Sequence, residues 1–73
     1  MSDTEPSAER AELSSLTTAL VELTRRVANM AEGAAAGGDE ELSGELFAVE
    51  RALRGAGRRL ERLTAPRTRR PSR

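Results

Sequence analysis

The sequence predicts an all-α fold, namely an antiparallel two-helix hairpin of the coiled-coil kind that pairs with a second copy into a four-helix bundle. Two apolar ladders with heptad spacing predict the helices, and a glycine-rich segment between them predicts the turn. The small size predicts self-association, because 73 residues without a cysteine bury little apolar surface and have no disulfide to compensate.

The first ladder predicts a helix over residues 8–32. Apolar side chains there recur every three or four residues, which places them along one side of an α-helix. The ladder consists of Leu13, Leu16, Leu20, Leu23, Val27 and Met30. Residues 1–7 are polar, contain Pro6 and have no apolar anchor, so we expect a disordered lead-in.

A turn is predicted over residues 33–38, where small residues run from Gly33 to Gly38. Gly33 suits a helix end because it adopts the left-handed conformation at little cost. Asp39 suits the N-cap of a second helix over residues 39–64. The ladder of that helix consists of Leu42, Leu46, Val49, Leu53, Ala56, Leu60 and Leu63. Pro66 limits the helix, and residues 65–73 are expected to be a disordered Arg/Pro-rich tail.

The two ladders fit each other in one antiparallel register. With Leu13 at heptad position a, a turn at 33–38 pairs a with a and d with d, for example Leu20 with Leu53. The flanking g positions then bring together residues of opposite charge. These pairs are Glu12 with Arg59 and Arg26 with Glu45.

The flank beside the e positions is predicted to be the association surface. Small residues there permit close approach of another helix, and Phe47, the single aromatic residue, lies on this flank. The predicted surface consists of Val21, Thr24, Ala28, Ala31, Phe47 and Glu50. An alternative is that Val21 and Phe47 only fold over the edge of their own hairpin.

Gly55 and Gly57 interrupt the second helix, where each glycine costs about 0.5–1 kcal/mol relative to alanine. Three interpretations remain open for this segment. Another backbone approaches closely there, the helix bends, or the glycines are merely tolerated.

The formal net charge of zero conceals an uneven distribution. Residues 1–45 carry ten acids and three Arg, whereas residues 46–73 carry nine Arg and two acids. Such asymmetry is typical of a basic segment that contacts a polyanion, of two halves that lie against each other, or simply of a solvated basic face. Candidate phosphate contacts are Arg51, Arg54, Arg58, Arg62, Arg67, Arg69, Arg70 and Arg73. No aromatic residue accompanies them to stack on bases.

Catalytic side chains are scarce. His, Cys, Lys and Tyr are all absent, so we expect no enzyme activity, no metal site and no cofactor. No apolar run is long enough for a membrane span, and no signal peptide is evident, so we expect a cytoplasmic protein. The predicted function is a small protein–protein interaction module acting as an adaptor, regulator or assembly subunit, in a homodimer or with a partner helix. The alternative is a nucleic-acid-associated protein whose Arg residues contact phosphates.

Overall fold

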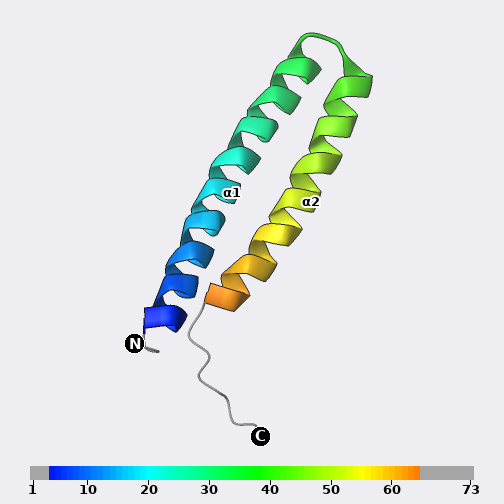
Figure 1. Ribbon diagram of the computed structural model, residues 1–73. Coiled ribbons are helices and arrows are strands. Elements are labelled where there is room, and N and C mark those ends of the chain that lie inside the picture. Colours follow the sequence, from blue (N-terminus) through cyan, green and yellow to red (C-terminus); the bar gives the residue numbers. More distant parts are fainter. Residues whose placement is uncertain (1–3, 65–73) are drawn as a thin grey trace, which may run out of the picture.

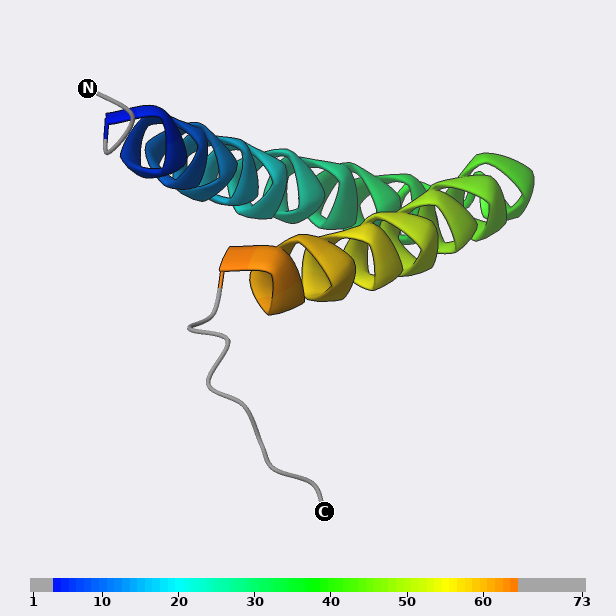
Figure 2. The ribbon, with the colours of Figure 1, turned by 60° about the horizontal axis from the view of Figure 1, so that its bottom comes forward.

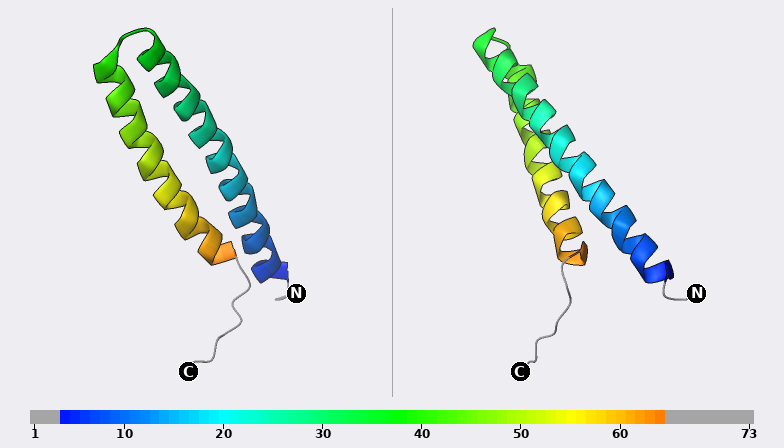
Figure 3. Two further views of the ribbon diagram at one scale, coloured as in Figure 1. Left: turned by 180° about the vertical axis from the view of Figure 1, so that it is seen from behind. Right: turned by 90° about the vertical axis from the view of Figure 1, so that its left-hand side faces the viewer.

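The computed structural model describes the backbone of residues 4–64 and the side chains of residues 8–64. It consists of two helices, α1 (Thr4–Ala36) and α2 (Glu40–Thr64), that pack against each other in antiparallel orientation (Figure 1). The predicted all-helical hairpin is therefore confirmed, and no strand occurs in residues 4–64. The right panel of Figure 3 shows that the two helices diverge with increasing distance from the turn. Figure 2 shows the same divergence from another direction.

The ends of the chain differ from the expected boundaries. α1 begins at Thr4, which places Pro6 in the first helical turn, where its missing N–H removes no helical hydrogen bond. Part of the expected lead-in at residues 1–7 is therefore helical. Residues 1–3 and the expected tail at 65–73 lie outside the described part of the chain.

The turn is shorter than predicted, because α1 continues through Gly33 to Ala36. Three successive alanines favour the helix strongly enough to offset Gly33. The helix instead ends at Gly38, which has a φ of 87°. Its N–H donates to the Ala35 carbonyl at 3.1 Å, and the Asp39 N–H donates to the Ala34 carbonyl at 2.9 Å. These two bonds form a Schellman motif, the glycine-dependent helix ending that the sequence placed five residues too early.

α2 begins as predicted. Oδ1 of Asp39 accepts a hydrogen bond of 3.2 Å from the Leu42 N–H, so Asp39 is the N-cap. Glu40 and Glu41 follow in the first turn, where carboxylates interact favourably with the helix dipole.

The short turn changes the register between the helices by about one helical turn. Leu20 lies against Gly57, and a Cβ added to Gly57 would be 3.6 Å from Leu20 Cδ2. The helices consequently meet along their a and e positions. The predicted pairing along a and d is wrong.

The most buried side chains in the contact between the helices are small. Ala31 is fully buried, and Thr24 and Ser43 retain only 9% and 7% exposure. Thr24 satisfies its hydroxyl by donating to the Leu20 carbonyl at 2.7 Å, as Thr17 does to the Leu13 carbonyl at 2.9 Å. No large side chain among residues 8–64 is fully buried.

Candidate functional site

Large apolar side chains line one outer side of the hairpin. Each is between 44% and 60% exposed, although heptad spacing predicted them to be the inner seam. They are Leu16, Leu23 and Met30 of α1 and Leu42, Val49 and Leu63 of α2. Ala56, the remaining d residue of α2, is also exposed. We call these seven residues the apolar face.

Helix geometry explains why the apolar face is a single surface. Successive residues are about 100° apart around an α-helix, so turning the a and e positions inward turns the d positions to the side. The two helices of an antiparallel hairpin are related by a two-fold rotation perpendicular to their common plane. That rotation keeps both d rows on the same side, so the rows of α1 and α2 form one continuous face.

Four charged residues at g positions lie along the rim of the apolar face. Glu12, Arg26, Glu45 and Arg59 are all exposed. The predicted pairs between Glu12 and Arg59 and between Arg26 and Glu45 do not form, because the register has changed. Within residues 8–64, no ion pair joins the two helices.

The two ion pairs in this part of the chain are each made within one helix. Arg25 contacts Glu22 at 3.1 Å in α1. In α2, Arg54 Nε donates to Glu50 at 2.9 Å, and the Glu50 side chain is only 13% exposed. A carboxylate at an e position is thus accommodated in the contact between the helices because Arg54 reaches it from the next turn.

The residues predicted to form the association surface do not lie on one outer surface. Thr24 and Ala31 are buried between the helices, together with most of the Glu50 side chain. Ala28 and Phe47 are half-buried. Val21 alone is well exposed, at 51%. The e positions of the predicted surface belong to the hairpin contact, whereas the d positions, which were predicted to form that contact, are exposed.

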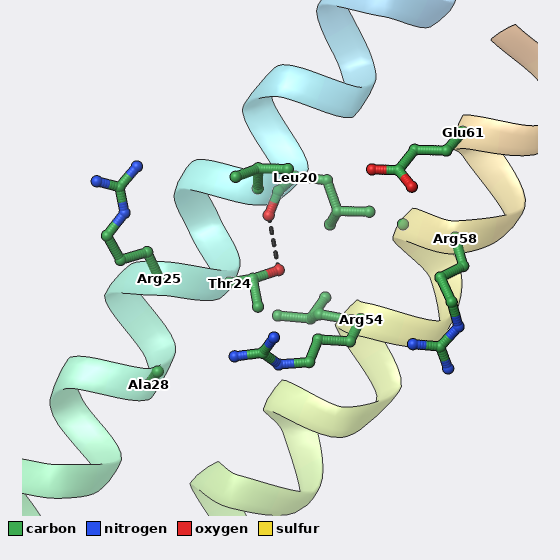
Figure 4. Close-up of a pocket in the computed structure, with 10 residues that line it drawn as sticks. Leu20, Thr24, Arg25, Ala28, Arg54, Arg58 and Glu61 are labelled. Carbon is green, nitrogen blue, oxygen red and sulfur yellow. Dashed lines mark hydrogen bonds between the residues drawn. The ribbon is translucent and has the colours of Figure 1, made fainter. Parts of the chain in front are cut away.

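An open groove of about 370 Å³ runs along the side opposite the apolar face. We call it the Val21 groove. It is lined by Leu20, Val21, Thr24, Arg25 and Ala28 of α1 and by Leu53, Arg54, Gly57, Arg58 and Glu61 of α2. Figure 4 shows Arg54 and Glu61 reaching from α2 toward α1, while Arg25 points away from α2. Charged side chains of both signs cover this side, in contrast to the aliphatic residues of the apolar face.

The candidate phosphate contacts on α2 are exposed to solvent. Arg51, Arg54, Arg58 and Arg62 are exposed, although Arg54 is engaged by Glu50. Arg58 and Arg62 also line, with Arg59, a shallow hollow of about 510 Å³ on the outer side of α2. The other candidates, Arg67, Arg69, Arg70 and Arg73, lie outside the described residues.

Two further findings concern metals and membranes. The described residues contain no group of three or more His, Cys, Asp or Glu side chains arranged to hold a metal ion. Neither α1 nor α2, as far as each is described, has an apolar stretch long enough to cross a bilayer. Comparisons of the chain with protein-family models, with curated proteins and with solved structures found no match.

Proposed function

We propose that this protein is a non-enzymatic protein–protein interaction module that docks another α-helical surface along the apolar face. The observation that carries the proposal is the exposure of six large aliphatic side chains on one side of a hairpin. Each of these side chains is 44–60% exposed, and contiguous apolar patches on monomeric proteins are often functional.

The interior of the hairpin provides the second argument. The contact between α1 and α2 buries an alanine and two small polar residues but no large side chain completely. A chain of this size with so small a core needs further support, and no cysteine is present to supply a disulfide. Docking of a helical surface on the apolar face supplies that support by removing aliphatic groups from water. An adaptor, a regulator and an assembly subunit all use such a surface.

Site-specific photo-crosslinking tests the proposal. A benzophenone amino acid is placed at Leu23, at the centre of the apolar face, or at Val21, which is similarly exposed but lies at the Val21 groove. We expect a discrete adduct in native cell extract from position 23 that Met30→Glu abolishes, and no such adduct from position 21. Equal labelling from both positions, or none from position 23, would contradict docking on the apolar face.

The second candidate function is binding of nucleic-acid phosphates, favoured by the hollow that Arg58, Arg59 and Arg62 line on α2. This function predicts salt-sensitive binding of duplex DNA or RNA that is lost in Arg58→Ala/Arg62→Ala. Arg25→Ala/Arg26→Ala is the matched control, because it removes two exposed Arg from α1. The docking function predicts no salt-sensitive binding in any of these proteins.

A further inference from the structure

We infer that the apolar face is covered by a second copy of the same chain, with α1 lying antiparallel on α1 and α2 antiparallel on α2. This inference rests on the proposed docking function and names its partner. The product is a four-helix bundle with a two-fold axis that crosses the helices. Three features of the hairpin support it, namely the shared centre of the two d rows, the charges along the rim, and the extent of the apolar face over both helices.

The d rows of the two helices have the same centre along the hairpin. The row on α1 is centred on Leu23, which is 13 residues before Ala36 at the turn end of the helix. The row on α2 is centred between Ala52 and Leu53, which are 12 and 13 residues after Glu40. At 1.5 Å per residue the two centres lie at nearly equal distances from the turn. One two-fold axis can therefore superimpose both rows on their own copies.

This axis brings each large side chain of the apolar face beside an apolar residue of the second copy. Leu23 lies next to its own copy, and Leu16 lies next to Met30 of the second copy. On α2, Leu42 lies next to Leu63 of the second copy, and Val49 lies next to Ala56 of the second copy. The layers so formed are those of a four-helix bundle, in which a contact within the hairpin and a contact between hairpins share the a, d and e positions.

The charges along the rim fit the same axis. Glu45 and Arg59 are each seven residues from Ala52, so the axis sets Glu45 beside Arg59 of the second copy, twice per dimer. Within one chain these two residues are 14 residues apart on one helix, about 21 Å, and cannot pair. Arg26 falls beside Ala19 of the second copy, so no like charges are opposed at that level.

The other way of stacking two hairpins, with α1 on α2, lacks this charge complementarity. In that arrangement residues at equal distance from the turn become neighbours. Glu45 then falls at the level of Ala31 of the second copy, and Arg59 falls at the level of Thr17, so neither meets a residue of opposite charge. The charges along the rim therefore favour the stacking in which α1 lies on α1 and α2 lies on α2.

The apolar face extends over both helices, as the apolar part of a dimer interface requires. Standard interfaces bury about 800 Å² per partner, and homodimer interfaces are about 65% apolar, which corresponds to about 520 Å² of apolar surface. The apolar face contributes six large apolar side chains, each 44–60% exposed in the single hairpin, to the apolar part of such an interface.

Light scattering on the purified full chain across a concentration series tests whether the partner is a second copy of the chain. We expect a mass of twice the 7.9 kDa of one chain at micromolar concentrations. Leu23→Glu should yield a monomer, because it places carboxylates next to each other at the axis. Val21→Glu is the matched control on the opposite side and should remain a dimer. A dimer that persists in Leu23→Glu would overturn the inference.

Exchanging the charges of Glu45 and Arg59 tests whether α2 lies antiparallel on α2 of the second copy. Glu45→Arg and Arg59→Glu should each raise the dissociation constant by about three- to tenfold, because each opposes like charges at two places in the dimer. The double variant Glu45→Arg/Arg59→Glu should restore the wild-type value. Since the two residues cannot meet within one chain, restoration requires the second copy. Failure to restore the value would contradict the proposed axis.

The same measurements separate failure of this inference from failure of the proposed function. A purified chain that stays monomeric overturns the inference that a second copy covers the apolar face. If photo-crosslinking from Leu23 then still gives an adduct heavier than two chains, docking on the apolar face stands with a different partner. A monomer without any adduct from Leu23 rejects both.

Discussion

Leu20 of α1 packs against Gly57 of α2, and a Cβ added to residue 57 would lie 3.6 Å from Leu20 Cδ2. This contact marks the register that the short turn sets between the helices. A leucine at an a position meets an e position of the other helix, so the helices approach over small residues. The larger side chains at d are left on the outside, where they form the apolar face.

Enlarging Gly57 should open the contact between the helices. Gly57→Leu is expected to lower the free energy of unfolding by about 1–3 kcal/mol, because only one additional carbon fits before Leu20 is reached. Gly55→Leu is the matched control, because the nearest atom to a Cβ at residue 55 is the flexible guanidinium of Arg58 at 3.9 Å. That variant should be neutral or more stable than wild type, since leucine favours the helix over glycine. Urea denaturation followed by circular dichroism at one fixed protein concentration measures both.

The turn provides a second test. Gly38 has a φ of 87°, so Gly38→Ala should destabilise the hairpin by about 1 kcal/mol. Gly33→Ala should have the opposite effect, a stabilisation of about 0.5–1 kcal/mol, because residue 33 is inside α1 and nothing lies within 4 Å of an added Cβ. If α1 ended at Gly33, as its sequence suggested, Gly33→Ala would instead be destabilising. Thermal unfolding of the two variants decides this.

The ion pair between Glu50 and Arg54 should matter more than an exposed pair does, because the Glu50 side chain is 13% exposed. Arg54→Met leaves that carboxylate without its hydrogen-bond donor, and we expect a loss of about 1–2 kcal/mol at neutral pH. Glu50→Gln/Arg54→Met should recover part of this loss, since an amide is less costly to bury than a carboxylate. Arg25→Met is the control at an exposed pair and should cost less than about 0.5 kcal/mol.

The fold was predictable because it depends on local patterns. Heptad spacing identified both helices, and Asp39 identified the start of α2 through its capping chemistry. The end of α1 was not predictable from Gly33 alone. Glycine can either end a helix or be carried within one, and the alanines that follow Gly33 decided in favour of continuation.

The candidate site depended on that one boundary. Moving the turn from residues 33–38 to Gly37–Asp39 changes the level at which the helices meet by four residues. Positions a and d then no longer face each other, and Thr24 and Ala31 move from the expected outer surface into the contact. Heptad periodicity by itself cannot separate these arrangements, because a, d and e together form one apolar stripe of a bundle helix. The run of alanines was the signal that would have separated them.

Self-association should link stability to concentration. If the second copy covers the apolar face, the melting temperature should rise with protein concentration, because dimerisation stabilises the folded hairpin by mass action. The melting temperature of Leu23→Glu should be lower and independent of concentration. Val21→Glu should retain the dependence. A wild-type melting temperature that does not change over a hundredfold concentration range would contradict dimerisation.

Disulfide capture tests most directly whether the apolar face is the interface between two copies. The chain contains no cysteine, so Leu23→Cys and Val21→Cys each introduce a single thiol. Under mild oxidation, Leu23→Cys should form a covalent dimer rapidly, because the two-fold axis passes beside residue 23, and Val21→Cys should remain largely monomeric. Rapid crosslinking of Val21→Cys with slow crosslinking of Leu23→Cys would contradict the account and would place the interface at the Val21 groove.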